Sequence, residues 1–218
     1  VEGKTDAEDE YILLFKGNAD ANIEKQPYYL YYATSNKLEG PYTVQGKYTD
    51  AATTIEDPSV FEWKDKYFML TYDLGNGISG AGQSVGMMIP SRDPHFFSFK
   101  DAQITSGMLN DYVKLPSGYT GSYSGTVRIE RPYLVFENGE PTYFTGTNSV
   151  DLNGNNVAQS YTFKINDLPE HQVSVDDKMK NGTIHLENDI TQAEQFDDVY
   201  FEVRPETGFV LVEDSIKI

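Results

Sequence analysis

The sequence contains no cysteine, and among its 218 residues there is a single tryptophan. Without cysteine the chain has neither a disulfide framework nor a thiol nucleophile. It also has no run approaching about 18 apolar residues, which excludes a membrane-spanning helix. Basic residues are few: 17 Lys and Arg stand against 34 Asp and Glu, giving a formal net charge of −17. Such a charge repels phosphate backbones and anionic membranes, so we expect neither nucleic acid nor a membrane as a partner.

Tyrosine and phenylalanine, by contrast, are abundant. There are 16 Tyr and 12 Phe, and aromatic residues make up 13% of the chain. Aromatic side chains suit pleated, half-buried surfaces, and no segment has a helical pattern longer than a turn or two. We therefore expect an all-β protein.

Two segments of the chain share one design. The first, "EDPSVFEWKDKYFMLTYD", begins at Glu56, and the second, "ERPYLVFENGEPTYFTGTN", begins at Glu130. Each has Glu-x-Pro, an apolar run, a short turn and a second aromatic run, and a partial copy precedes them in "EYILLFKGN" and "QPYYLYYATS". Repeated units of about four strands are typical of β-propeller blades, because one small sheet cannot bury both of its faces alone.

The second unit ends in a polar segment, "SVDLNGNNV", which we expect to be a loop before the strand "AQSYTFKI". After Ile165 the composition changes to polar and turn-rich, so we divide the chain into propeller blades at residues 1–165 and a β-rich extension at residues 166–218. Within the extension, "TIHLEN", "DVYFEV" and "GFVLVEDSIKI" predict strands. The extension is a last blade, a clasp that pairs back onto the propeller, or the start of a β-sandwich module.

The acids of the two Glu-x-Pro segments lie where the innermost strands of propeller blades would begin. Such strands line the central channel, so residues at their starts converge on one pocket. Converging acids raise one another's pKa, and glycoside hydrolysis needs one carboxyl group protonated and another ionised. The proline is expected to hold the preceding residue in extended geometry, which aims the carboxylate.

Three segments together resemble glycoside hydrolase family 43 and related five-bladed β-propeller enzymes. "IEDPSVFEWKDKYFMLTYD" resembles the blade that begins Ile-Asp-Pro, and "RIERPYLVFENGEPTYFTGT" is similar to the later blade with Glu-x-Pro. "YYLYYATSNKLEGPYTVQG" resembles the Tyr-rich strand that leads to Gly-Pro-Tyr or Gly-Pro-Phe. The resemblance implies that Glu130 is the general acid, that Asp57 modulates the pKa of that acid, and that hydrolysis inverts the anomeric centre.

The chain departs from the family in two respects. The family takes its general base from an Asp on a blade upstream of the Tyr-rich one, and a five-bladed ring needs more residues than lie between Val1 and Ile165. We therefore expect that a preceding segment or another chain completes the ring, or that the ring differs and the base lies elsewhere. The middle residue of Glu-x-Pro is usually Gly in the family, whereas here it is Arg131. This cation could bind a carboxylate or sulfate on the sugar, or pair with a neighbour.

Each candidate residue also has a purely structural interpretation. Glu130 could form an ion pair with Arg128 or Arg131, and Asp57 could form an Asx turn. Glu56 could exchange roles with Asp57, because a shift of one residue moves a side chain to the other face of a strand. Glu130 and Asp57 are thus the predicted catalytic residues, and Glu56, Arg128 and Arg131 are the predicted substrate-binding residues.

Other polar and aromatic residues are given no catalytic role. Asp93, in "SRDPHFF", is predicted to form a turn. Trp63 and Tyr67 are core residues or a sugar platform. No organic cofactor and no catalytic metal is expected, although a structural calcium ion would find many oxygen ligands. The histidines share no metal-ligand spacing: His95, His171 and His185.

The sequence thus predicts a secreted or periplasmic glycoside hydrolase that acts on plant or algal polysaccharides or their oligosaccharides. A carbohydrate-binding propeller without catalysis is the alternative, and it is the better account if the assembled protein lacks a general base. A propeller polysaccharide lyase is the third interpretation, for which a His or Tyr base and an Arg or metal beside a uronate are expected. The localisation follows from the resemblance alone.

Overall fold

The structure is a computed structural model of the chain. It describes residues 2–3, 10–18, 28–49, 55–74, 77–114, 119–121, 127–152, 155–166, 169–176 and 178–212. These residues form β-strands and three short 3-10 helices, with no α-helix among them, so the expected all-β class is confirmed. The chain divides into two compact units, Val1–Ile165 and Asn166–Ile218, and each has its own sheets.

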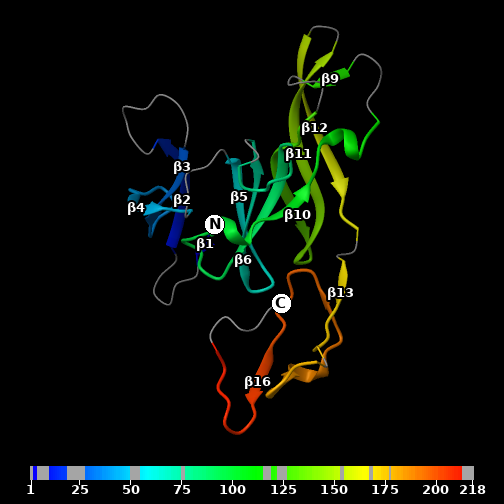
Figure 1. The fold of residues 1–218 in the computed structure, drawn as a ribbon. Helices are drawn as coiled ribbons and strands as arrows, with labels where there is room; N and C mark the ends of the chain where they lie inside the picture. The colour runs from blue at the N-terminus through cyan, green and yellow to red at the C-terminus, as the bar shows by residue number, and fades with distance from the viewer. Residues whose placement is uncertain are drawn as a thin grey trace. The chain divides into compact units, whose positions relative to one another are not determined.

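The first unit begins with an antiparallel sheet whose strands are neighbours in chain order (Figure 1). Its strands are β1 (Glu2–Gly3), β2 (Glu10–Asn18), β3 (Tyr28–Ser35) and β4 (Thr43–Lys47). Along β2 the side chains alternate, because Ile12 is buried whereas Leu13 and Phe15 are exposed. This period of two is the one expected for a strand with one face on a core.

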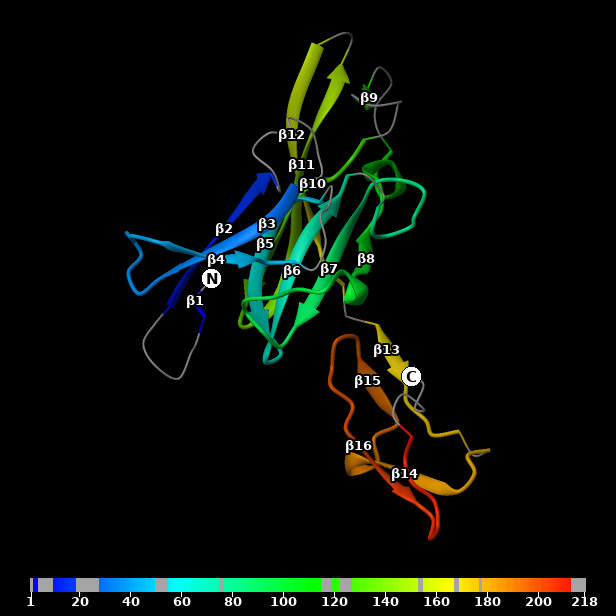
Figure 2. The ribbon, with the colours of Figure 1, turned by 60° about the vertical axis from the view of Figure 1, so that its left-hand side comes forward.

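The second sheet of the first unit is a four-stranded meander (Figure 2). Its strands are β5 (Ile55–Trp63), β6 (Lys66–Asp73), β7 (Val85–Ser91) and β8 (Gln103–Ser106). The turn between β5 and β6 has positive φ at both central residues, Lys64 (49°) and Asp65 (56°). Positive φ at both positions is the requirement of a type I′ turn, whose twist matches that of the two strands.

The third sheet carries the second Glu-x-Pro segment. Its strands are β10 (Glu130–Glu137), β11 (Glu140–Leu152) and β12 (Asn155–Lys164), and β9 (Tyr119–Gly121) pairs with the end of β11. The turn between β10 and β11 again has positive φ at both central residues, Asn138 (55°) and Gly139 (87°). The two Glu-x-Pro units thus share the same hairpin, as their common sequence design predicts.

One predicted loop is wrong. The described residues of "SVDLNGNNV" belong to strands, because β11 continues to Leu152 and β12 begins at Asn155. Cross-strand pairs run from Tyr143 with Lys164 to Leu152 with Asn155 without a register shift. These polar residues are strands because β11 and β12 lie opposite each other and exchange backbone hydrogen bonds.

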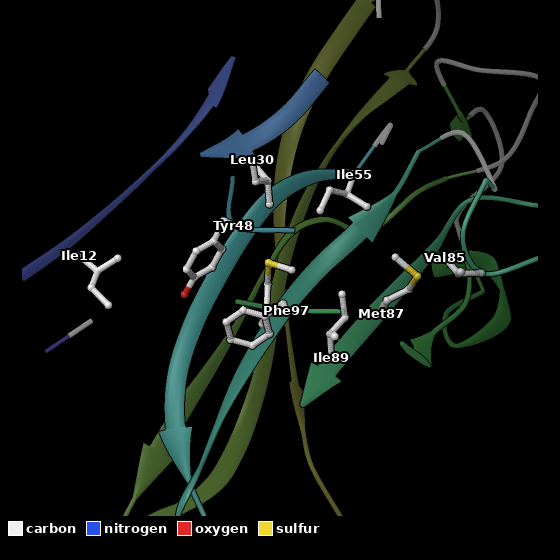
Figure 3. Packing of buried hydrophobic residues seen from close by; sticks show 9 residues of the cluster. Ile12, Leu30, Tyr48, Ile55, Val85, Met87, Ile89 and Phe97 are labelled. Carbon is white, nitrogen blue, oxygen red and sulfur yellow. The ribbon is translucent and has the colours of Figure 1, made fainter. Parts of the chain in front are cut away.

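The main core lies between the first and second sheets (Figure 3). Phe97, which follows β7, ties these sheets together: its N–H donates to the carbonyl oxygen of Tyr48 (3.0 Å), and the two rings pack with centroids 5.1 Å apart. Trp63 is also buried and packs on Phe68, so it is a core residue. The core cluster consists of Ile12, Leu30, Tyr48, Ile55, Met69, Val85, Met87, Ile89 and Phe97.

The second and third sheets pack through β5 and β10. Phe61 of β5 lies against Phe136 of β10, with ring centroids 5.3 Å apart. Ile129, just before β10, is fully buried in a smaller core, and Gly146 on β11 makes room for it, because a Cβ at that position would clash with the Ile129 side chain. The starts of β5 and β10 are thereby held in neighbouring sheets. None of the three sheets is closed among the described residues, and a five-bladed ring would need further sheets.

The second unit contains two small antiparallel pairs. β13 (Glu170–Gln172) pairs with β15 (Gln192–Glu194), and β14 (Gly182–Leu186) pairs with β16 (Phe201–Pro205). β14 overlaps most of the predicted strand "TIHLEN", and β16 overlaps the second half of the predicted strand "DVYFEV".

The third strand predicted in the second unit is absent from the part of that segment that the structure describes. Residues 209–212 are irregular and exposed, the N–H of Phe209 donates to the carbonyl oxygen of Glu206 in a turn (3.0 Å), and residues 213–218 lie outside the described residues. An apolar run becomes a strand only where a neighbouring strand accepts its backbone hydrogen bonds. No such strand pairs with this run among the described residues.

Candidate functional site

The candidate site lies where β5 and β10 begin, and the two Glu-x-Pro segments have the same backbone there. The middle residues have left-handed φ angles, 53° at Asp57 and 50° at Arg131. Each lies within a register shift, between Glu56 and Ser59 in one sheet and between Glu130 and Tyr133 in the other. The sequence repeat is therefore also a repeat of a β-bulge at the start of a strand.

The extended geometry expected before the proline is wrong at both positions. A β-bulge inserts an extra residue into one strand, and the left-handed residue absorbs the bend. Aspartate tolerates this region better than most residues, whereas a long side chain such as arginine is strained in it. On β5 the bulge is fixed from the next strand, because the buried Thr71 hydroxyl donates to the carbonyl oxygen of Glu56 (2.8 Å).

Glu56 points to the first sheet. Its Oε1 accepts a hydrogen bond from Nζ of Lys16 on β2 at 3.0 Å, and both side chains are about one third exposed. Because this ion pair is partly in solvent, it contributes little to stability, of the order of 1 kcal/mol or less. It does, however, bring a cation of the first sheet to the start of the second sheet. No feature of the sequence indicated that Lys16 would be part of this cluster.

Asp57 points to the third sheet instead. Its Oδ2 accepts a hydrogen bond from the backbone N–H of Arg131 at 3.2 Å, so the two repeated motifs are in direct contact. Glu56 and Asp57 therefore do not occupy equivalent places, and an exchange of their roles would need a different register. Asp57 and Glu130 belong to neighbouring sheets, and the Asp57 carboxylate is bonded to the residue that follows Glu130.

Burial and two neighbouring acids raise the pKa of Glu130. Burial is the largest cause, and the negative charges of Asp57 and Glu56 add to it. Arg128 acts in the opposite direction, with Nη1 at 3.9 Å from Oε1 of Glu130. The predicted ion pair with Arg128 is thus present but loose. A carboxyl group in this setting keeps its proton to higher pH than a solvent-exposed glutamate, as a general acid must.

Buried polar groups line the inner side of this cluster. Tyr72, which pairs with Glu56 across the hairpin, is fully buried. Burial raises the pKa of Tyr72 to about 12, so the hydroxyl stays protonated at neutral pH. Asn148 donates from Nδ2 to the carbonyl oxygen of Arg128 at 2.9 Å, which holds the strand leading to Glu130. Sequence reasoning missed Tyr72 and Asn148, although counting back from the Lys64-Asp65 turn places Tyr72 near Glu56.

Asp73 is a further carboxylate that the sequence analysis missed. It is fully buried at the end of β6 and accepts hydrogen bonds from the backbone N–H groups of Gly77, Ile78 and Ser79 and from the Ser79 hydroxyl, at 2.9 to 3.3 Å. Its role is to fold the Gly-rich segment after β6, because carboxylate oxygens collect backbone donors strongly.

We expect Asp73→Ala to destabilise the protein by about 1–3 kcal/mol, because it leaves several backbone donors without their acceptor. The free energy of unfolding, obtained from the midpoint and slope of urea unfolding, measures this loss. Asp101→Ala is the matched control, because Asp101 is exposed in the short 3-10 helix before β8. It should change the free energy of unfolding by about 0.5 kcal/mol or less. Equal midpoints for the two variants would contradict the assignment.

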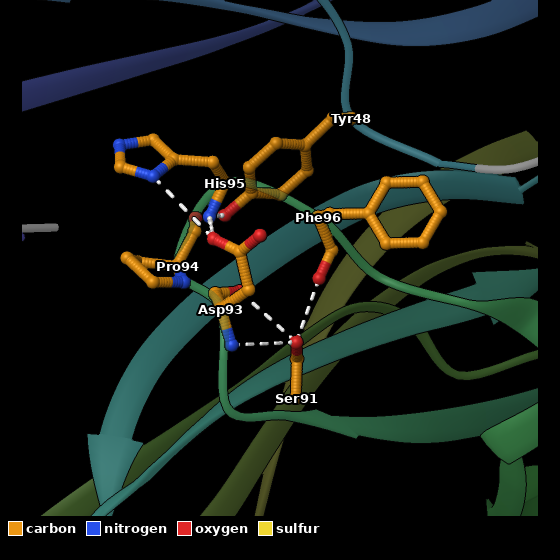
Figure 4. A network of polar contacts seen from close by, with 6 residues as sticks. All are labelled: Tyr48, Ser91, Asp93, Pro94, His95 and Phe96. Carbon is orange, nitrogen blue, oxygen red and sulfur yellow. Dashed lines mark hydrogen bonds and ion pairs between the residues drawn. The ribbon is translucent and has the colours of Figure 1, made fainter.

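Asp93 forms the predicted turn (Figure 4). Its Oδ1 accepts from the backbone N–H of His95 at 2.8 Å, and its own N–H donates to Oγ of Ser91 at 3.0 Å. Ser91 also donates to the carbonyl oxygen of Phe96 at 2.7 Å. Glu56 is level with the start of β7, whereas the turn follows the last residue of β7. Asp93 therefore lies at the other end of the sheet from the candidate acids.

Comparisons with known proteins add no assignment. No protein-family model matches the chain, and no curated protein matches it. Within the part of the chain that the structure describes, no group of three or more His, Cys, Asp or Glu is placed to hold a metal ion. Nor does that part contain a helix long and apolar enough to cross a membrane.

Proposed function

We propose that the protein is a glycoside hydrolase of the five-bladed β-propeller type, similar to family 43, with Glu130 as the general acid and Asp57 as the residue that keeps the acid protonated. One observation carries this proposal: a partly buried Glu130 whose pKa is raised by burial and by Asp57 and Glu56. Three acids from two adjacent sheets meet there. Such an arrangement suits a reaction that needs one protonated carboxyl group beside ionised ones.

The contacts at the strand starts support a propeller arrangement. Lys16 of the first sheet contacts Glu56 of the second, and Asp57 of the second contacts the backbone of Arg131 in the third. Each sheet thus reaches the start of the next one along the chain, which is how blades around a channel would meet. Two further sheets, from a preceding segment or from another chain, would complete the ring.

In the proposed mechanism Glu130 donates its proton to the glycosidic oxygen as the bond to the sugar breaks. Water attacks the anomeric carbon from the opposite face and gives its proton to a general base, so that the product has inverted configuration. The resemblance places this base on an Asp of a blade upstream of β2 and β3. It should lie about 6.5 to 9.5 Å from Glu130, the separation that leaves room for the water.

Incubation with neutral and acidic oligosaccharides of plant and algal origin tests the proposal. We expect new reducing ends, and proton NMR of the first product should detect the inverted anomer. Release of an unsaturated uronate, detected by its ultraviolet absorbance, would instead identify a lyase. The raised pKa of Tyr72 argues against a lyase in which this residue is the base, because its hydroxyl is a poor proton acceptor at neutral pH.

The pH dependence of hydrolysis provides a sharper test of the role of Asp57. Activity should fall as pH rises through the pKa of Glu130, because only the protonated acid can donate. In Asp57→Asn the charge that helps to raise this pKa is lost, so the basic limb of the profile should move to lower pH. Asparagine can still accept the hydrogen bond from Arg131 and tolerates positive φ, so the bulge should persist.

The control for this measurement is Asp93→Asn, which removes one carboxylate from the turn at the other end of the second sheet. Its basic limb should coincide with that of the parent protein. A basic limb that stays in place for Asp57→Asn would show that Asp57 does not act on the catalytic acid.

A carbohydrate-binding protein without catalysis is the second candidate. The observation that favours it is the pairing of acids with cations, Glu56 with Lys16 and Glu130 with Arg128. In such a protein the acids would accept hydrogen bonds from sugar hydroxyls. Calorimetric binding of an oligosaccharide together with an absence of hydrolysis would select this candidate.

A further inference from the structure

Arg131 stands apart among the charged groups of the candidate site. Lys16 forms an ion pair with Glu56, and Arg128 lies beside Glu130. The Asp57 carboxylate accepts a hydrogen bond from the backbone N–H of Arg131 and not from its guanidinium. The Arg131 side chain is exposed, and it has no hydrogen bond or ion pair with any residue that the structure describes. It is therefore the cation of this cluster that is open to a ligand.

The backbone does not explain why an arginine occupies this position. At φ of 50° glycine or asparagine would be less strained, and a long side chain adds cost without stabilising the bulge. The equivalent residue of the second sheet, Asp57, uses the same backbone to reach the start of the next sheet. Arg131 presents a guanidinium from the same place on the third sheet, and its charge acts on the carboxyl group of Glu130.

We propose that Arg131 binds an anionic group, a carboxylate or a sulfate ester, on a sugar held next to Glu130, so that the substrate is an acidic carbohydrate. The guanidinium suits such groups because its planar fork of N–H donors matches two oxygens at once. This inference rests on the proposed function, in that it takes the strand starts to be a carbohydrate site. The net charge of −17 repels acidic polymers elsewhere, so binding should be local and saturable.

Calorimetric titration of the Glu130→Gln protein tests the inference without turnover. The probes are tetragalacturonic acid, a sulfated galactan tetrasaccharide and the neutral xylotetraose. In this background, Arg131→Asn should weaken binding of at least one acidic probe by about ten- to a hundredfold and leave xylotetraose unchanged. Arg131→Lys should retain part of the affinity, because it keeps the charge but loses the fork. Arg92→Asn, at the opposite end of the second sheet, is the matched control and should bind like the parent.

Folding of these variants is checked by thermal unfolding. Arg131→Asn should be at least as stable as the parent, because asparagine adopts positive φ at lower cost. A loss of affinity in a variant of unchanged or higher stability therefore reports on the guanidinium.

Two results would overturn the inference: an Arg131→Asn protein that binds the acidic probes as tightly as its parent, or a parent that binds neither acidic probe. Hydrolysis of the probes by the protein with Glu130 intact separates this inference from the proposed function. If xylotetraose is cleaved through Glu130 while Arg131→Asn changes nothing, the hydrolase stands and the anion site is wrong. If the acidic probes bind through Arg131 and none is cleaved, the anion site stands and the hydrolase is wrong.

Discussion

Replacement of Glu130 by Gln is expected to lower the rate of glycoside hydrolysis by about 10²- to 10⁴-fold, the range found when a general acid is removed. Glutamine has nearly the shape of the protonated acid but cannot give up a proton to the leaving oxygen. Binding of the oligosaccharide should persist, because the neighbouring charged groups remain in place. Initial rates from released reducing ends, together with calorimetric affinities, measure the two effects separately.

The same substitution should raise the stability of the fold at neutral pH. The pKa of Glu130 is raised in the folded protein, chiefly by burial, whereas a carboxyl group in the unfolded chain ionises near its ordinary pKa of about 4.3. Between these two pKa values the folded state binds more protons than the unfolded state, so stability falls as pH rises through this window. Glutamine carries no charge and escapes this loss. The difference in melting temperature between variant and parent should therefore grow from about pH 4 toward neutral pH.

The matched control is Glu137→Gln, at an exposed position near the other end of the same strand. It should leave both the rate and the pH dependence of stability close to those of the parent. Parental activity in Glu130→Gln would exclude the catalytic assignment. Lower stability of this variant than of the parent at neutral pH would mean that the ion pair with Arg128 outweighs the cost of burial.

Phe97→Ala should destabilise the protein by about 3–5 kcal/mol, the usual cost of removing a buried phenylalanine ring. Phe97 is fully buried in the core between the first and second sheets, and its ring packs on Tyr48. Its backbone hydrogen bond to Tyr48 would remain, so the loss isolates the packing of the ring. The midpoint and slope of urea unfolding give the free energy of unfolding.

The chain provides a control for this substitution in the preceding residue. Phe96 is 42% exposed, and the hydrogen bond to its carbonyl oxygen does not need the side chain. Phe96→Ala should therefore change stability by about 0.5 kcal/mol or less. Similar losses in the two variants would contradict the position of Phe97 in the core. A loss in Phe97→Ala should also weaken the contact of Lys16 with Glu56, since this core holds the two sheets together.

Much of the local structure could be predicted from the sequence. Apolar and aromatic runs bounded by turns indicated β2, β5, β6, β10 and β14. Along β10 and β14 the more buried and the exposed side chains alternate, whereas most of β6 is buried on both faces. The repeated Glu-x-Pro segments indicated equivalent hairpins, and both hairpins have the same turn. The sequence analysis failed where pairing rather than pattern decides. The polar end of β11 is a strand because β12 lies opposite, and the apolar residues 209–212 are irregular without a described partner strand.

The candidate site was predicted only in part. Glu130 and Asp57 were named from the resemblance of their segments to family 43 blades, but the contact of Asp57 with the segment of Glu130 depends on β5 and β10 being neighbours. Lys16 and Tyr72 could not be assigned, since one comes from another sheet and the other reads as an ordinary core aromatic. The left-handed bulge was also missed, because the rule for residues before proline describes single residues and not the pairing of strands.

The sequence by itself determined that the chain is all-β, where most strands lie and which acids begin them, because these properties depend on residue type and on spacing along the chain. The tertiary structure decided which of these acids meet and which keeps a raised pKa. Burial and the distance between charges are properties of packed sheets, and residues more than seventy positions apart, such as Asp57 and Arg131, become neighbours only through that packing.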